Sequence, residues 1–356
     1  FSTVADGVKG KRAKEWGLVD DVYMGSKYDE QIVGRVKELA AQSTRPDGLE
    51  GITLDPIEIP ADGSDIELEH VSFRFDRAQR LGTLVVRGPS GAQPADPDAI
   101  HAAGSDYWPL RAFRELDRIL LHLRLNEPEI GTVLVKSEGD AAAVLASDAV
   151  LDKHRDHWLV NEIIQYIKRT LKRVDYTAKS FLGVIEPGSC FAGTLFELIL
   201  CSDRSYMLDD PDRPVTIELS VMNGGSYPMG NGLSRLETRF LNDPGKPAEL
   251  LGRGGAFEAL DAEESGLVTF APDDIDWDDD VRFAIEERTS LSPDALTGME
   301  ANLRFGGPET METKIFGRLT AWQNWIFQRP NAVGERGALK IYGQAGIRPE
   351  FDWRRT

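Results

Sequence analysis

Apolar and polar residues alternate along two neighbouring runs, 68–75 and 81–86, and this pattern predicts the paired strands of a hairpin. Further along the chain, helical spacing takes turns with short apolar runs that are typical of buried strands. Helices are predicted at 108–125, 157–171 and 196–200, and strands at 132–136, 181–185 and 204–208. Strands that alternate with helices favour an α/β fold with parallel pairing.

The two ends of the chain have a different pattern. Helical spacing predicts a helix at 29–41, and residues 44–64 are rich in Pro, Gly and acidic residues, which indicates a linker. From residue 277 onward the pattern is mainly helical, at 281–288, 292–303 and 311–327. We therefore expect a helical region to follow the α/β part.

One short pattern occurs twice, once near the start of the chain and once in its last third. The copies are Ala13-x3-Gly17-Leu18-Val19 and Ala262-x3-Gly266-Leu267-Val268. In each copy a short helix ends at a Gly, which suits the left-handed position after a helix, and a Leu-Val strand follows. The repeat predicts two similar modules. Because the chain also lacks an initiator Met, we expect the core of the first module to lie upstream of Phe1.

Charge and composition narrow the classes of partner. The chain has 41 Lys and Arg against 59 Asp and Glu, a net charge of −18, which argues against a nucleic-acid partner. Its apolar runs are shorter than the roughly 18 residues of a membrane span, and no membrane partner is expected. Cys190 and Cys201 are the only two cysteines, and a pair of thiols in so long a chain indicates a reducing, cytoplasmic location.

The stretch 185–203 has the pattern most typical of a functional site. A predicted strand runs into a turn with Gly188 and Gly193, then directly into a helix that carries Glu197. Free N–H groups at the start of a helix can stabilise a carbonyl oxygen that gains negative charge during a reaction. The alternative interpretation is an ordinary strand-to-helix turn.

This stretch resembles the crotonase (enoyl-CoA hydratase/isomerase) superfamily, in which a Gly-rich turn precedes Glu-Leu, four residues and Asp; here these are Glu197-Leu198 and Asp203. A downstream landmark is similar at Gly225-x2-Pro228, and the Ala-x3-Gly-Leu-Val element closes the superfamily's core. The resemblance implies a spiral of ββα repeats. It divides the chain into the tail of a first unit (1–45), a linker (46–66), a second unit (67–276) and a helical C-terminal region (277–356).

Longer runs, at 186–194, 203–208, 271–279, 291–334 and 338–343, resemble one branch of this superfamily. That branch opens the ring of an epoxidised or dihydroxylated benzoyl-CoA with water, in aerobic benzoate degradation. The products are an aliphatic semialdehyde CoA thioester and formate. The resemblance implies an acyl-CoA thioester partner, a homo-oligomer, and no cofactor or metal, since CoA is part of the substrate.

Carried over position by position, the resemblance assigns a catalytic role to Glu197. It places oxyanion or thioester donors at Ala146, Gly193 and Thr194. The superfamily's second catalytic glutamate falls at Val221, and Glu218 three residues earlier would face the other side of a strand. We therefore expect the main chemistry to lie in the first unit.

Three functions remain open at this stage. The chain can be the C-terminal portion of the ring-opening lyase, a non-catalytic scaffold that also drives oligomerisation, or an independent hydratase or isomerase that uses Glu197. The first two are compatible with each other. A test of whether the chain alone turns over substrate would separate the first two functions from the independent hydratase or isomerase.

A few other residues have a possible role of their own. His154 and His157 have a spacing that could bind a metal, although surface or capping roles are the commoner use. Candidate contacts to CoA phosphates are Lys136, Lys153, Arg155 and Lys340. In the last helical run, Trp322 and Trp325 share a face with other apolar residues, which predicts either a buried core or a subunit interface.

Overall fold

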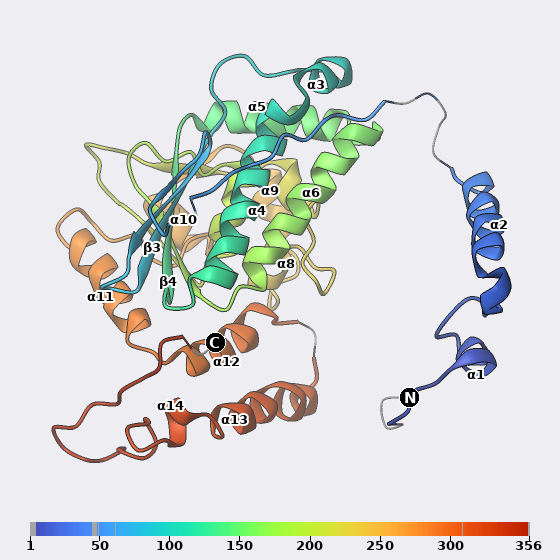
Figure 1. Cartoon of the computed structure of the whole chain (residues 1–356). Helices are drawn as coiled ribbons and strands as arrows, with labels where there is room; N and C mark the ends of the chain where they lie inside the picture. Colours follow the sequence, from blue (N-terminus) through green and yellow to red (C-terminus); the bar gives the residue numbers. More distant parts are fainter. Residues whose placement is uncertain (1–4, 45–47, 49, 61, 308, 355–356) are drawn as a thin grey trace. The chain divides into compact units, whose positions relative to one another are not determined.

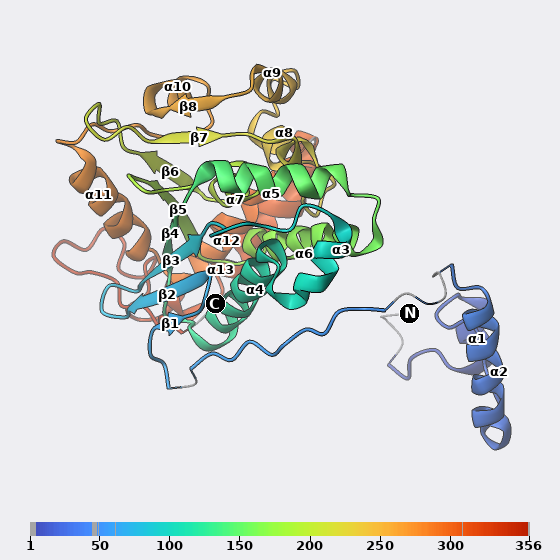
Figure 2. The same cartoon turned by 90° about the horizontal axis from the view of Figure 1, so that it is seen from above.

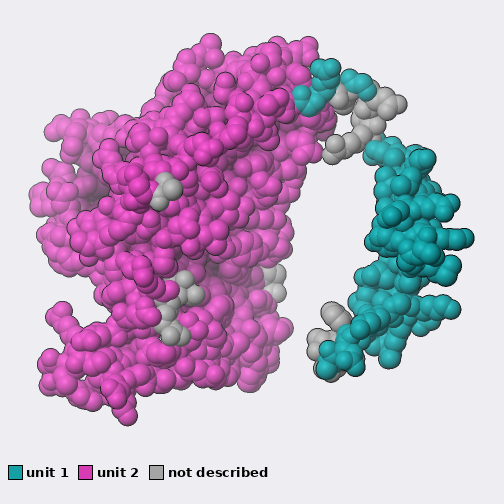
Figure 3. Space-filling view, in the orientation of Figure 1, with its two compact units in different colours: residues 1–51 teal, residues 52–356 magenta. Residues whose placement is uncertain are grey.

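A computed structural model describes residues 5–354 apart from 45–47, 49, 61 and 308. The chain divides into two compact units, residues 1–51 and 52–356 (Figure 3). The boundary lies inside the predicted linker 46–66. Residues after it belong to the second unit, where Arg114 donates to the carbonyl of Asp55 and Ser105 donates to its side chain.

The first unit consists of short helices. They are α1 (Gly10–Glu15), a 3-10 turn (Gly25–Lys27) and α2 (Tyr28–Ala41). Along α2 the apolar residues Val33, Val36 and Leu39 are each more than half exposed. Among the described residues of this unit only Ala13 is buried, so its apolar side chains pack against little within the unit.

The second unit is built on a six-stranded sheet (Figure 1). In spatial order its strands are β1 (Ile66–Glu67), β2 (Val71–Asp76), β3 (Leu81–Arg87), β4 (Thr132–Glu138), β5 (Ser180–Ile185) and β6 (Arg204–Met207). The first three pair antiparallel, as the predicted hairpin requires, and β3 to β6 pair parallel. The apolar runs of β4 and β5 fit this place, because inner parallel strands are buried on both faces.

Helices cover both faces of the sheet (Figure 2). One face packs with α4 (Trp108–Asn126), α6 (Trp158–Asp175) and α7 (Gly193–Leu200) in the main core. On the other face Leu134, Leu182 and Val184 contact α11 (Trp277–Thr289) through Ala284 and its neighbours. Two more helices before β5 are α3 (Pro97–Ala103), which a 3-10 turn (Gly104–Asp106) follows, and α5 (Ala141–Lys153).

A second, two-stranded sheet pairs β7 (Thr216–Glu218) with β8 (Ala256–Glu258). Around it lie a 3-10 turn (Val221–Gly224), α8 (Arg235–Arg239), α9 (Lys246–Arg253) and α10 (Ala259–Glu264). These short elements follow α7 and β6, and they bring polar side chains to the start of α7.

The C-terminal region is helical, as the sequence predicts. It contains α12 (Pro293–Arg304), a π-helix (Thr313–Leu319), α13 (Thr320–Ile326) and α14 (Pro330–Val333). Trp322 and Trp325 are half-buried and meet edge to face at 5.5 Å between ring centroids, whereas Phe316 is 71% exposed. The apolar face of this helical run is thus half-buried at the two tryptophans and exposed at Phe316. The predicted subunit interface stays a prediction.

Candidate active site

The turn between β5 and α7 brings the backbone close to a carboxylate. At Gly193, the first residue of α7, φ is +44°, and a Cβ atom there would lie 1.9 Å from Oδ2 of Asp148. Neither the backbone conformation nor the space accepts a side chain. Only glycine lets the start of α7 approach Asp148 this closely.

Asp148, on α5, binds the first turn of α7. Its carboxylate accepts the main-chain N–H of Thr194 at 2.8 Å, and it also accepts the hydroxyl of Thr194. A third donor is the hydroxyl of Ser220, at 2.6 Å. An anion that accepts free N–H groups at a helix start is stabilised by those hydrogen bonds and by the helix dipole. Asp148 therefore caps α7 from another helix.

The cluster around Asp148 is closed to water. Asp148 is 1% exposed, and burial raises its pKa to about 6 against the opposing hydrogen bonds from Ser220 and Thr194. The hydroxyl of Tyr227 lies 3.0 Å from that of Thr194, and burial raises the pKa of Tyr227 well above its ordinary value. Because the Thr194 hydroxyl donates to Asp148, the neutral phenol of Tyr227 donates to Thr194.

Ala146 does not occupy the place that the resemblance assigns to it. It is the sixth residue of α5 and is exposed. Only the first four amides of a helix lack an intrahelical acceptor. The main-chain N–H of Ala146 is therefore used within α5, and the structure does not present it as an oxyanion donor beside Thr194. The resemblance placed Ala146 in a short segment that supplies a donor, and the structure has it inside the regular helix α5.

Glu197 lies one turn further along α7 and is 2% exposed. Its Oε1 accepts from Asn223 at 2.8 Å, and its Oε2 accepts from Arg235 at 2.9 Å. Burial raises the pKa of Glu197, and the charge of Arg235 and the amide of Asn223 oppose that rise. Both oxygens of the predicted catalytic carboxylate are thus occupied by neighbouring side chains.

Arg235 connects Glu197 to a second acid. Its guanidinium donates to Asp175 at 2.7 and 3.3 Å, in addition to Glu197. The side chains of this network are at most 2% exposed. A buried guanidinium between two carboxylates holds all three side chains in place.

No acidic side chain stands where the resemblance places the superfamily's second catalytic glutamate, as the sequence indicates. Val221 is 57% exposed, and Glu218 lies on β7 opposite Ala256. The residue that the structure brings to Glu197 from this segment is Asn223, which has no proton to give or take at neutral pH. Asn223 and Asp148 were not predicted as site residues from the sequence. Ser220 and Asn223 form a capping box, and this spacing was the available signal.

The other predicted site residues lie apart from this cluster. Lys136 pairs with Glu186 at 2.6 Å and Arg155 with Asp152 at 2.6 Å, while Lys153 and Lys340 are exposed. His154 and His157 are half-buried. Within the described part of the chain, no three His, Cys, Asp or Glu side chains gather as a metal site would need.

None of the described helices has the length and apolar character to cross a membrane.

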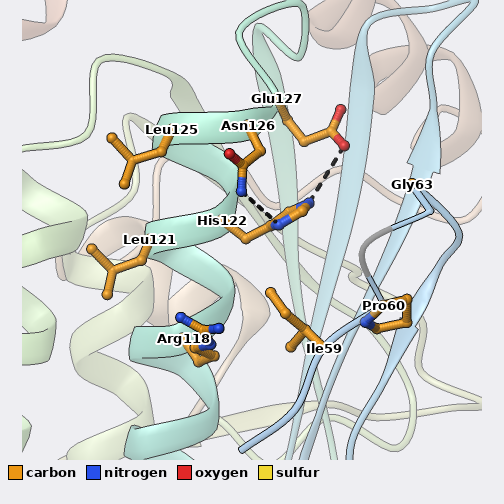
Figure 4. Close-up of a pocket in the computed structure, with 9 residues that line it drawn as sticks. All are labelled: Ile59, Pro60, Gly63, Arg118, Leu121, His122, Leu125, Asn126 and Glu127. Atoms are coloured by element: carbon orange, nitrogen blue, oxygen red, sulfur yellow. Dashed lines mark hydrogen bonds and ion pairs between the residues drawn. The ribbon is translucent and has the colours of Figure 1, made fainter.

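A hollow of about 520 Å³ lies between α4 and the extended segment before β1 (Figure 4). Within it His122 lies 3.1 Å from the amide of Asn126 and 3.5 Å from Glu127, which also pairs with Arg77 at 2.7 Å. Among its polar residues, His122, Asn126 and Glu127 contact one another or Arg77, whereas Arg118 is exposed. The hollow contains no residue of α7, so it is separate from the candidate site.

Comparison with known proteins gives both a relative and a fold. The chain is 49% identical over its whole length to a benzoyl-CoA-dihydrodiol lyase of Aromatoleum evansii, of which it spans 64%. An enoyl-CoA hydratase of Bacillus anthracis superposes with a TM-score of 0.57 at 15% identity, over 80% of this chain and 99% of that one. No protein-family model matches.

A third protein, an enoyl-CoA hydratase/carnithine racemase of Magnetospirillum magneticum, gives a TM-score of 0.56 at 15% identity, over 81% of this chain and 97% of that one. These likenesses establish the crotonase fold and confirm the α/β fold and the resemblance predicted from the sequence. The part of the chain that carries this fold includes the cluster around Asp148 and Glu197.

Proposed function

We propose that this chain is part of a lyase that opens the ring of an epoxidised or dihydroxylated benzoyl-CoA with water. The products are an aliphatic semialdehyde CoA thioester and formate. Support comes from the 49% identity to a benzoyl-CoA-dihydrodiol lyase over the whole chain, together with a fold shared with enoyl-CoA hydratases. Because the chain spans 64% of that relative, the reaction is assigned to a longer protein.

Within that lyase, we infer that the module over residues 67–276 is structural. The observation that carries this inference is the hydrogen bond from the amide of Thr194 to the carboxylate of Asp148. A thioester oxygen that gained negative charge here would meet a carboxylate already in its place. Two like charges 4 Å apart repel by about 4 kcal/mol at an effective dielectric constant of 20. The donor that should stabilise the transition state is therefore occupied.

The state of Glu197 leads to the same inference. A general base must be free to take a proton from substrate or water. Glu197 would first have to leave Arg235 and Asn223, and breaking a buried ion pair costs about 3–5 kcal/mol. The acid and base of ring opening would then come from the part of the lyase outside this chain.

Residues 1–45 fit the end of another module of the same kind. In the first copy of the repeat the amide of Leu18 donates to the carbonyl of Ala13 at 2.9 Å, and in the second copy Leu267 donates to Ala262 at 2.8 Å. Leu267 is fully buried, whereas Leu18 is 42% exposed. The two copies thus share a local structure, but only the second is packed against other apolar side chains. We propose that the rest of the longer lyase packs against the first copy in the same way.

The cellular setting follows from the same proposal. The partners are an acyl-CoA thioester and further copies of the lyase, whose contacts would use exposed apolar residues of the C-terminal helices such as Phe316. Cys190 and Cys201 are both buried free thiols. Thiols kept reduced agree with a cytoplasmic enzyme.

Ring opening by the purified chain, alone and mixed with the remainder of the lyase, tests the proposal. The substrate is epoxidised benzoyl-CoA, and released formate is measured. We expect turnover in the mixture and none with the chain alone. Turnover by the chain alone would overturn the structural role of its module. A mixture that assembles but gives no turnover would overturn the proposed lyase function. Crotonyl-CoA serves as the second substrate, because hydration of it by the chain alone would mark an independent hydratase.

A further inference from the structure

A hollow of about 250 Å³ lies between the end of α7, α8 and α12 and is lined in part by Arg235. Three guanidinium groups and two carboxylates line it. They are Arg235, Arg239, Arg304, Asp175 and Asp203. So many cations around one hollow are unusual in a chain whose net charge is −18.

Two of the three arginines have carboxylate partners. Arg235 pairs with Asp175 and Glu197, and Arg304 pairs with Asp203 at 2.9 Å. Arg304 also lies 3.1 Å from Glu300, whose burial and proximity to Asp203 raise its pKa well above its usual range and favour the neutral form at pH 7. The charges of both arginines are therefore balanced inside the protein.

Arg239 has no such partner among the residues that the structure describes. It follows Arg235 by one helical turn, so that both side chains leave the same face of α8. Its Nε donates to the carbonyl of Gly266, and its two terminal nitrogens have no acceptor in the described chain. Burial lowers the pKa of Arg239, with no acid near enough to oppose that change. The terminal nitrogens are not fully buried, so an anion in the hollow can reach them.

We propose that this hollow is a binding site for a small oxyanion, a phosphate or a carboxylate, held by Arg239. The two terminal nitrogens of a guanidinium form a planar fork that matches two oxygens of such an anion. The neighbouring Cys201 adds no competing charge, because burial raises the pKa of its thiol well above the ordinary value. At roughly 30 Å³ per water molecule, the hollow has room for an anion of a few heavy atoms and its waters.

Calorimetric titration of the whole chain with sodium phosphate, and separately with sodium acetate, tests the site at constant ionic strength in sodium chloride. We expect saturable binding of at least one of the two anions at one site per chain. Arg239→Gln should weaken that binding at least tenfold. The matched control is Arg118→Gln, an exposed arginine on α4 without an ion-pair partner in the described chain (Figure 4), and binding should stay within twofold.

Saturable binding by neither anion, or equal binding by the wild type and Arg239→Gln, would overturn the proposal. Circular dichroism first checks that each variant is folded. If Arg239→Gln does not fold, Arg239→Lys keeps the charge and loses the fork. A phosphate affinity for this variant equal to that of the wild type would then count against a fork-bound anion, and a loss of threefold or more would support it.

Discussion

The carboxylate of Asp148 accepts the main-chain N–H of Thr194 at 2.8 Å, across 46 residues of sequence. This contact places a carboxylate at the amide that the resemblance assigns as an oxyanion donor. It also requires Gly193 at the start of α7, since any side chain there would meet Asp148. The contact therefore decides both the local structure and the inferred loss of catalysis.

The stability of the chain should depend on pH through Asp148. Its pKa rises from 3.8 in the unfolded chain to about 6 in the folded one. Between these values the folded state holds more protons than the unfolded state, so the free energy of unfolding falls as the pH rises. A shift of about two units corresponds to about 3 kcal/mol.

Urea unfolding at pH 4 and pH 7 measures this effect against Asp148→Asn, which cannot ionise. Because part of this linkage lies below pH 4, the wild type should lose about 2 kcal/mol more than the variant between the two pH values. Equal losses would show that Asp148 does not carry the pH dependence.

Replacement of Gly193 by alanine should be far more harmful than replacement of Gly188. Both glycines have positive φ, +44° and +91°, but a Cβ at Gly188 has nothing within 4 Å. Backbone strain alone costs about 1–3 kcal/mol. The clash with Asp148 adds to that strain only in Gly193→Ala, and the difference in urea midpoint between the two variants reports it. Similar midpoints would contradict the close approach.

The buried network of Arg235 should contribute much more to stability than an exposed ion pair. Arg235→Gln leaves two buried carboxylates without their charge partner, and we expect a loss of about 3–5 kcal/mol in the free energy of unfolding. Arg253→Gln removes an exposed pair with Asp261 and should cost less than about 1 kcal/mol. Chemical denaturation of both variants provides the comparison, and equal costs would rule out a fixed network.

The C-terminal helices should form subunit contacts through Phe316. This residue is 71% exposed, whereas Trp325 is half-buried and stacks with Arg329 at 4.5 Å, so Trp325 tests the fold of the region instead. Phe316→Asp should shift sedimentation toward a smaller species. Leu125→Asp, on the equally exposed end of α4, should leave it unchanged. An unaltered oligomer in Phe316→Asp would contradict the interface.

The regular elements could be predicted because their apolar patterns are strong. The parallel strands β4 and β5 and the helices α4 and α6 lie within a few residues of their predicted ranges. The helix α5 was missed, because its run of Ala, Val and Ser has no clear polar face. The donor position of Ala146 came from the resemblance alone, and the apolar pattern did not place that residue inside a helix.

The site itself could be predicted only in part. The turn, Gly193 and the position of Glu197 follow from local sequence. The contacts of Asp148 with Thr194 and of Glu197 with Asn223 and Arg235 join residues 46, 26 and 38 positions apart. Such contacts depend on tertiary packing, which spacing along the chain does not encode.

The most direct measurement is kcat/KM for ring opening of epoxidised benzoyl-CoA by the whole lyase that carries Glu197→Gln. This substitution keeps the shape of the side chain and removes its charge, and circular dichroism and sedimentation check the fold and the assembly. A structural module predicts a value within about threefold of the wild type. A loss of a hundredfold or more, with fold and assembly intact, would contradict the account and make Glu197 catalytic.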